Sequence, residues 1–286
     1  MGASETDLYC VFGNPIAHSK SPLIHGLFAE QTAQALRYEA RLAPLDGFAA
    51  EVSEFAQQNG RGANVTVPFK LEAFALCDRL SKRAESAGAV NTLRFVDDKI
   101  EGDNTDGVGL VRDIVVNAGF AIRGKRVLLI GAGGAARGAL LPLLEQQPKS
   151  VLISNRTVSK AEELVAMASK WTSEKDVCTA SSFQDVSGEF DLIINASSAS
   201  LMGESIALPN TLYAPQSLAY DMMYGAELTP FLKNAQNAGS MVRDGLGMLI
   251  EQAAEAFAIW RGVRPDTQRV FAQLRGALSA AKDLST

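Results

Sequence analysis

The sequence predicts an α/β fold with two lobes, for three reasons. Short apolar runs, long enough only for strands, recur along the chain. Between them lie segments in which apolar residues recur every three or four positions, a spacing typical of amphipathic helices. This alternation favours a parallel sheet covered by helices on both faces. The length of 286 residues corresponds to about two domains.

The first third of the chain begins with a strand. Residues 8–12 are apolar, and Asn14-Pro15 stops the strand after them. Ser21-Pro22 looks like a helix N-cap followed by proline at the first helical position. Further strand candidates follow at residues 37–42, 63–67 and 89–96.

A helical period begins at residue 105 and ends at 118, just before Gly119. A β-α-β pattern then starts at Arg126, with strand candidates at residues 127–130, 151–154, 192–195 and 219–222. A second strong helix runs from Leu246 to Phe257, and residues 279–286 are expected to form a loose tail. One lobe should therefore occupy the middle of the chain, with the last helices returning to the N-terminal lobe. Two bridging helices are expected to leave a cleft between the lobes.

Composition excludes several classes of protein. Lys and Arg number 27 against 32 Asp and Glu, a formal net charge of −5, which argues against a nucleic-acid or membrane-surface binder. Three scattered cysteines and two histidines form no zinc-binding pattern, so we expect no metal. No apolar run has the length of a membrane span, and no secretory signal is evident. A cytoplasmic location is expected.

A glycine-rich turn predicts a dinucleotide site. The run Gly131-Ala132-Gly133-Gly134-Ala135-Ala136 fits GxGxxA and lies between a predicted strand and a predicted helix. In this motif the first glycine permits the tight turn and the second lets the backbone approach a pyrophosphate. The helix N-terminus that follows offers free N–H groups to the phosphates.

The end of the next strand favours NADP over NAD. NAD-binding units place a carboxylate there for the ribose 2′-hydroxyl. Here Asn155-Arg156-Thr157 follows the strand, and Arg156 can pair with a 2′-phosphate, with Lys160 as a second cation. The chain also lacks a Tyr-x-x-x-Lys pair and a Cys/His zinc set, so another group must handle the alcohol proton.

Several motifs, in chain order, resemble the shikimate dehydrogenase family. They are residues 12–25 (FGNPIAHSKSPLIH), 62–70 (GANVTVPFK), 88–92 (GAVNT), 102–107 (GDNTDG), 131–138 (GAGGAARG), 155–157 (NRT) and 244–252 (DGLGMLIEQ). The resemblance implies an N-terminal α/β substrate domain and a Rossmann-type NADP domain, bridged by two helices. It places the catalytic domain at residues 1–105 with 246–286 and the NADP domain at 106–245. The implied reaction is the reduction of 3-dehydroshikimate to shikimate by NADPH.

The resemblance also implies roles for individual residues. Lys70 and Asp106 match the catalytic pair, which reduction of a ketone needs because the new alkoxide requires a proton. The implied substrate contacts are Ser19, Ser21, Asn64, Thr66, Asn91, Tyr224 and Gln252. The implied cofactor contacts are Gly131, Ala132, Gly133, Gly134, Ala135, Asn155, Arg156, Thr157, Lys160, Ala196, Ser197, Met222, Gly245 and Met248. Ala199 stands near where the family commonly has a glycine, which leaves the backbone course beyond Ser197 open.

Three other functions stay open at this point. A quinate/shikimate dehydrogenase using NAD is the nearest, and Arg156 and the serine spacing speak against it. A dinucleotide-sensing regulator without turnover is a second, although it would not need both Lys70 and Asp106. A methyltransferase fits the glycine-rich turn alone. The expected partner is the small-molecule substrate, with the chain a monomer or a homodimer.

Overall fold

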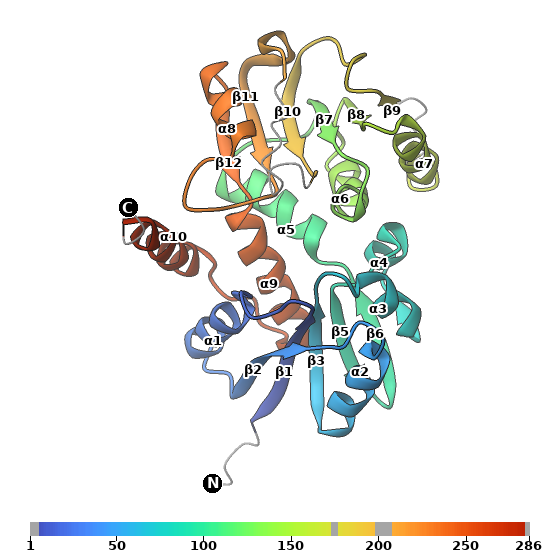
Figure 1. Ribbon diagram of the computed structural model, residues 1–286, viewed down its shortest axis with the longest axis vertical. Helices are drawn as coiled ribbons and strands as arrows, with labels where there is room; N and C mark the ends of the chain where they lie inside the picture. Colours follow the sequence, from blue (N-terminus) through green and yellow to red (C-terminus); the bar gives the residue numbers. More distant parts are fainter. Residues whose placement is uncertain (1–5, 173–176, 198–207, 284–286) are drawn as a thin grey trace. The chain divides into compact units, whose positions relative to one another are not determined.

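The computed structural model describes residues 6–172, 177–197 and 208–283 (Figure 1). The chain divides into two compact units, one made of Met1–Gly109 with Ile250–Val270 and the other of Leu110–Leu249 with Phe271–Thr286. The fold is α/β, with a mixed six-stranded sheet in the first unit and a parallel one in the second. The sequence-based boundaries differ from this division mainly in where the last residues belong, and they stay a prediction.

The first unit is built on a mixed sheet in the order β2-β1-β3-β5-β6-β4. Its strands are β1 (Asp7–Gly13), β2 (Leu36–Leu42), β3 (Gly60–Val65), β4 (Arg79–Leu80), β5 (Thr92–Val96) and β6 (Lys99–Asp103). Strand β1 is parallel to both of its neighbours, whereas β5 is antiparallel to β3 and β6. The helices are α1 (Ser21–Gln31), α2 (Phe48–Gln57), α3 (Lys70–Leu76) and α4 (Lys82–Ala87).

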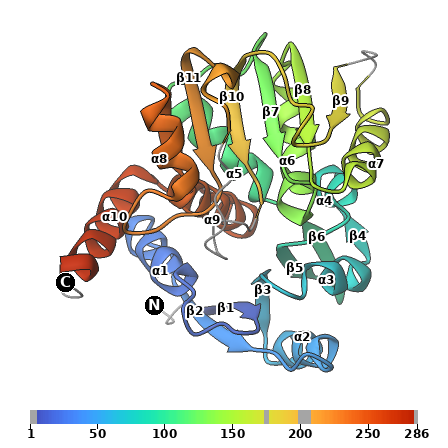
Figure 2. The same cartoon turned by 45° about the horizontal axis from the view of Figure 1, so that its top comes forward.

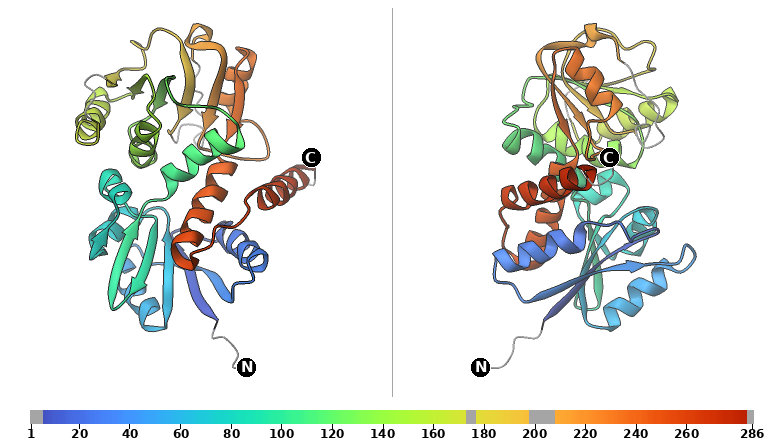
Figure 3. Two further views of the ribbon diagram at one scale, coloured as in Figure 1. Left: turned by 180° about the vertical axis from the view of Figure 1, so that it is seen from behind. Right: turned by 60° about the vertical axis from the view of Figure 1, so that its left-hand side comes forward.

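Residues 9–13 of strand β1 are buried, so both faces of the sheet are covered at this strand. Phe12 packs against Phe48 and Phe55 of α2 in edge-to-face contacts, with ring centroids 5.8 and 5.7 Å apart. On the other face, Phe28 of α1 meets Phe257 of α9 (Leu246–Arg261) at 5.8 Å. Figure 3 shows α1 and α2 on opposite sides of the strands. Buried aromatic rings of this kind supply much of the hydrophobic stabilisation of a core.

The second unit holds a parallel sheet in the order β12-β11-β10-β7-β8-β9, and Figure 2 shows β11, β10, β7, β8 and β9 side by side. Its strands are β7 (Arg126–Ile130), β8 (Ser150–Ser154), β9 (Cys178–Ser181), β10 (Phe190–Asn195), β11 (Tyr213–Asp221) and β12 (Met241–Asp244). Successive residues of β7 face opposite sides. Leu129 packs with α6 (Gly134–Glu145) and α7 (Val158–Ala168), whereas Leu128 packs with α8 (Pro230–Asn237).

The predicted strands at residues 63–67, 89–96 and 219–222 correspond to β3, β5 and β11 with shifted bounds, and three other local predictions need correction. The predicted helix over 105–118 is α5 (Asp106–Arg112) followed by a π-helical turn (Asp113–Asn117), in which buried Asp113 accepts hydrogen bonds from Tyr220 and Arg243. Helix α1 begins one residue early, because the Lys20 carbonyl already accepts from Ile24, so Ser21 is not the N-cap. The expected loose tail is helical as far as α10 (Gln268–Asp283) reaches.

Candidate active site

Lys70 and Asp106 form an ion pair in the first unit. Each begins a helix, α3 and α5 respectively. Lys70 Nζ donates to Asp106 Oδ2 at 2.6 Å, and the two side chains are 31% and 18% exposed. Partly exposed pairs contribute at most about 1 kcal/mol to stability. The pair is therefore better suited to chemistry on a small molecule than to holding the fold together.

Buried amides fix the Asp106 carboxylate. Asn91, in the link between α4 and β5, donates from Nδ2 to Asp106 Oδ1 at 2.8 Å, and its Oδ1 accepts from the Thr105 backbone at 2.9 Å. The Asn104 side chain accepts from the Asp106 backbone N–H at 3.2 Å, which caps the first turn of α5. One carboxylate oxygen thus faces Asn91 and the other faces Lys70.

Asn64 extends this network across the sheet. It lies at the carboxyl end of β3 and donates from Nδ2 to the Asn91 carbonyl at 3.1 Å and to Thr92 Oγ1 at 3.2 Å. Its Oδ1 accepts from the Tyr38 hydroxyl at 2.7 Å. Gln252 of α9 places Oε1 3.4 Å from both Asn91 Nδ2 and Thr105 Oγ1. The structure therefore brings Lys70, Asp106, Asn91, Asn64 and Gln252 into one connected set.

Ser19 and Ser21 lie where α1 begins. The Ser21 backbone donates to Ser19 Oγ at 3.3 Å, and Ser21 is buried. Burial raises the pKa of Tyr38 well above its usual value, and a hydrogen bond with Ser21 opposes that shift in part. Thr66 is half-buried, and its backbone N–H donates to the Phe12 carbonyl at 2.9 Å.

Sequence reasoning missed Tyr38, Asn104 and Thr105. Asn104 and Thr105 lie inside the GDNTDG motif, so closer attention to that motif would have found them. Tyr38 carries no such signal, because a tyrosine in a strand is usually a packing residue. Tyr224 follows β11 in the second unit, where burial raises its pKa and the Asp244 carboxylate adds to the shift. Its substrate role stays a prediction.

The glycine-rich turn joins β7 to α6 in the second unit. Gly131 has φ +103°, and a Cβ there would lie 3.2 Å from the backbone of both Ala196 and Ser197. Gly133 and Gly134 face open space, since a Cβ at either would meet nothing within 4 Å. Helix α6 begins at Gly134, so its first N–H groups have no partner within the helix. This exposed, positively polarised turn fits a pyrophosphate.

The carboxyl end of β8 carries the predicted cations. Asn155 Nδ2 donates to the Thr157 carbonyl at 2.8 Å, which folds the link to α7 back on itself. Arg156 and Lys160 are exposed, and neither makes an ion pair with another residue in the described ranges. Cations free in this way can pair with a phosphate.

The other predicted cofactor contacts lie along the same carboxyl edge. The Met222 backbone donates to the Asn195 carbonyl at 3.0 Å, and a Cβ at Gly245 would lie 2.1 Å from the Met222 carbonyl oxygen. Ser197 donates from Oγ to Asn195 Oδ1 at 2.7 Å. Met248 is half-buried in the first turn of α9. The run beyond Ser197, including Ala199, lies outside the described residues.

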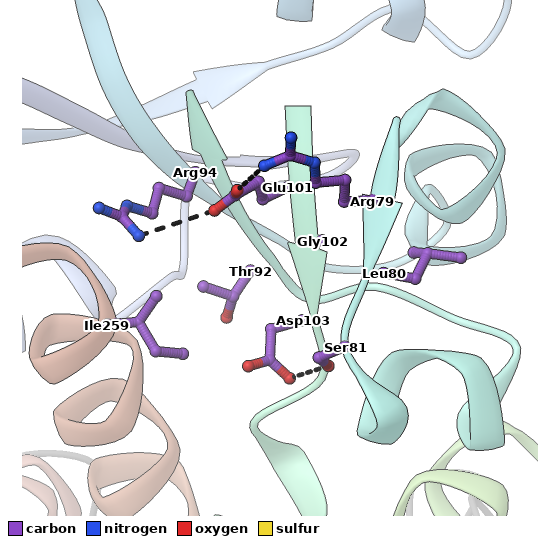
Figure 4. Close-up of a pocket in the computed structure, with 9 residues that line it drawn as sticks. All are labelled: Arg79, Leu80, Ser81, Thr92, Arg94, Glu101, Gly102, Asp103 and Ile259. Atoms are coloured by element: carbon purple, nitrogen blue, oxygen red, sulfur yellow. Dashed lines mark hydrogen bonds and ion pairs between the residues drawn. The ribbon is translucent and has the colours of Figure 1, made fainter. Parts of the chain in front are cut away.

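A pocket of ≈ 260 Å³ lies in the first unit (Figure 4). Arg79 and Arg94 share Glu101 at its rim, and Asp103 accepts from Ser81 within it. None of the predicted site residues lines this pocket. In the part of the chain that the structure describes, no three His, Cys, Asp or Glu side chains gather as a metal site, and no helix is long and apolar enough to cross a membrane.

Three family models match the chain: Shikimate dehydrogenase substrate binding domain over residues 11–93, Shikimate / quinate 5-dehydrogenase over 114–204, and Shikimate 5'-dehydrogenase C-terminal domain over 245–275. The chain is 58% identical over 276 residues to the shikimate dehydrogenase (NADP(+)) of Dechloromonas aromatica (strain RCB), covering 96% of this chain and 100% of that protein.

Solved structures are similar over the same length. An Ael1 enzyme from Pseudomonas putida is 49% identical with a TM-score of 0.89, covering 94% of this chain and 98% of that one. A shikimate 5-dehydrogenase from Thermus thermophilus, in complex with NADP(H) and shikimate, is 31% identical with a TM-score of 0.80, covering 95% of this chain and 100% of that one.

Proposed function

The chain belongs to the shikimate dehydrogenase family, and we propose that Lys70 and Asp106 are the catalytic pair of its reaction. That reaction is the NADP-dependent interconversion of 3-dehydroshikimate and shikimate, a step in aromatic amino acid biosynthesis. The observation that carries the assignment is the contact of 2.6 Å between Lys70 Nζ and Asp106 Oδ2, in side chains that solvent still reaches.

The pair manages charge and a proton during reduction of the ketone. NADPH, when bound, supplies the hydride. As the carbonyl oxygen gains negative charge, the Lys70 ammonium stabilises it and donates a proton to it. In the oxidation direction, the pair accepts the hydroxyl proton. Asp106 holds the ammonium in place and accepts a hydrogen bond from a ring hydroxyl.

The polar residues around the pair orient the substrate. We assign Asn64, Thr66, Asn91 and Gln252 to the ring hydroxyls, and Ser19 and Ser21 to the carboxylate. Asn64, Asn91 and Gln252 are already connected by hydrogen bonds, so little freedom is lost when substrate arrives. Preorganised contacts of this kind lower the barrier by fixing the reacting atom. Tyr224 is retained as a further substrate contact.

The second unit binds the cofactor. The residues at the 131–136 turn fit a pyrophosphate, because Gly133 and Gly134 leave space and α6 presents its N-terminus. Arg156 and Lys160 are assigned to the 2′-phosphate, which favours NADP over NAD, with Asn155 and Thr157 shaping that loop. The reaction needs both units, because Lys70 and Asp106 lie in one and this turn in the other.

A kinetic grid tests the function. Purified protein is mixed with shikimate or quinate and with NADP⁺ or NAD⁺, and reduced cofactor is followed by its absorbance. We expect shikimate with NADP⁺ to have a kcat/KM at least about 100-fold above that of the other three combinations. Quinate should leave polar groups of the site without their partners, and NAD⁺ should leave the proposed phosphate-binding cations without a phosphate, and sites built for polar contacts discriminate strongly against such losses. Faster turnover of quinate with NAD⁺ would favour the alternative enzyme. Cofactor binding without turnover would favour a regulator.

Two further assignments belong with this proposal. We propose that the chain acts as a monomer or a homodimer, which sedimentation would distinguish. We also propose a cytoplasmic location, where the biosynthetic substrates and NADPH are found.

A further inference from the structure

An arginine outside the reacting pair joins a strand end to a helix in the first unit. Arg83 of α4 donates from Nε and Nη2 to the two carboxylate oxygens of Asp103, at 3.0 and 2.6 Å. Its Nη1 donates to Glu255 Oε1 at 2.9 Å. Asp103 ends β6, and Glu255 lies in α9. One planar guanidinium, with its fixed fork of donors, therefore sets the distance between these two carboxylates.

The network continues along α9. Arg264 donates to Glu255 Oε2 at 2.6 Å and to Glu251 Oε2 at 2.7 Å, and Thr267 Oγ1 donates to Glu251 Oε1 at 2.6 Å. Glu251 is 1% exposed. The other charged side chains of the network are between 16% and 28% exposed, and partly exposed ion pairs contribute little to stability, while a buried charge such as Glu251 costs desolvation that its partners must offset. Stability alone is therefore a weak reason for placing these charges here.

Asp103 controls the turn that leads to Asp106. Its Oδ1 accepts from Ser81 Oγ at 2.5 Å, as Figure 4 shows, and from the Asn104 backbone at 2.7 Å. Asn104 Oδ1 in turn accepts from the Asp106 backbone. The carboxylate that Arg83 holds is thus two hydrogen bonds away from the first residue of α5.

Glu255 is connected to Gln252 through helix α9. The two residues are three positions apart on α9, so their side chains lie on one side of the helix. Gln252 Oε1 lies 3.4 Å from Asn91 Nδ2, and the same Asn91 amide holds Asp106. Arg83 therefore holds the two segments that must stay in register for Asp106 and Gln252 to meet one substrate.

We propose that Arg83 is a positioning residue for the reaction: by binding Asp103 and Glu255 together, it sets the spacing between Asp106 and Gln252. The inference rests on the proposed roles of Asp106 and Gln252. Arg83 does not touch the reacting atoms, so its removal should misplace groups and leave the chemistry of each unchanged.

The first test compares three variants by kcat, shikimate KM and NADPH Kd. Arg83→Met should lower kcat about 10- to 100-fold, the effect of a displacement of about 1 Å in a positioned group, with the NADPH Kd unchanged. Arg83→Lys should recover only part of the loss. Lysine keeps the positive charge, but its ammonium cannot bind both carboxylates with the fixed geometry of a guanidinium. Arg94→Met is the matched control. Arg94 pairs with Glu101 at 3.6 Å and is 46% exposed, and kcat should stay within about twofold.

A double-mutant cycle separates positioning from a general structural role. In an Asp106→Asn background, Arg83→Met should change kcat by less than about twofold, because the group it positions no longer acts. Equal effects in both backgrounds would overturn the proposal, as would an unchanged kcat in Arg83→Met. Full activity of Asp106→Asn alone would instead refute the proposed catalytic pair. If Arg83→Met does not fold, Glu255→Gln should raise the shikimate KM about fivefold or more, and an unchanged KM would overturn the proposal.

Discussion

Burial keeps the His25 side chain neutral. It is 0% exposed, and its ring stacks on Tyr38 with centroids 4.2 Å apart and an angle of 4°. Its polar neighbour is Asn64, whose side-chain hydrogen bond opposes in part the effect of burial on the His25 pKa. Burial lowers the pKa of His25 from 6.5 to about 3. The ring is therefore neutral near pH 7. It packs against the ring of Tyr38, and the Tyr38 hydroxyl donates a hydrogen bond to Asn64.

This burial predicts a specific dependence of stability on pH. Between pH 6.5 and about 3 the unfolded chain carries a proton on His25 that the folded chain lacks, so the free energy of unfolding falls as the pH falls. The loss is about 1.4 kcal/mol per pH unit within that window. In urea unfolding, the intact protein should lose about 2 kcal/mol more than His25→Phe between pH 7 and pH 5. Equal losses in both proteins would contradict a buried neutral His25.

At this scale, motifs pointed to the proposed reacting groups but not to the residues that hold those groups in place. Lys70, Asp106, Asn91 and Gln252 stand in recognisable motifs, and the structure connects them. Tyr38 and Arg83 do not, because their importance depends on partners 26 and 172 positions away. Only the folded sheet brings such partners together, so spacing along the chain carries no signal of them.

Among the elements, the turn between β7 and α6 contains glycines with different physical requirements. Position 131 requires glycine, because φ is positive there and a Cβ would come too close to the backbone of Ala196 and Ser197. At Gly133, φ is −85° and a Cβ would meet nothing within 4 Å. The first glycine is therefore required by the fold, whereas the second leaves room for a ligand.

Two substitutions separate these requirements. Gly131→Ala should destabilise the protein by about 1–3 kcal/mol, the usual cost of a strained backbone conformation. Gly133→Ala should leave stability within about 0.5 kcal/mol but weaken NADPH binding at least about tenfold, since the methyl group occupies the space for the pyrophosphate. Thermal unfolding and calorimetric titration measure the two effects. A Gly133→Ala variant that binds NADPH normally would contradict this placement of the cofactor.

The sequence predicted elements where apolar spacing was regular and missed them where it was not. The parallel strands β7, β8 and β10 were predicted to within two residues at each end. Strand β6 (KIEGD) was missed because charged residues interrupt its apolar pattern, although it pairs along its full length with β5. The last turns of α10 were read as a tail because Ser279 and Ala280 give no apolar face.

At the scale of the whole molecule, the proposed catalytic and cofactor-binding residues are divided between the two units. The first holds Lys70, Asp106 and the amides around them, and the second holds the 131–136 turn and Arg156. Each unit has its own sheet and its own buried core. A change to the catalytic pair should therefore abolish turnover without affecting cofactor binding, which is the central claim of the proposed mechanism.

The most direct test is the kcat of Lys70→Ala for shikimate oxidation by NADP⁺, measured on protein shown to bind NADPH with unchanged Kd. Because the ion pair is partly exposed, stability should change by no more than about 1 kcal/mol. We predict that kcat falls at least about 100-fold, the contribution of a proton donor that also stabilises the developing charge. A kcat within about twofold of the intact protein would contradict the catalytic role of Lys70.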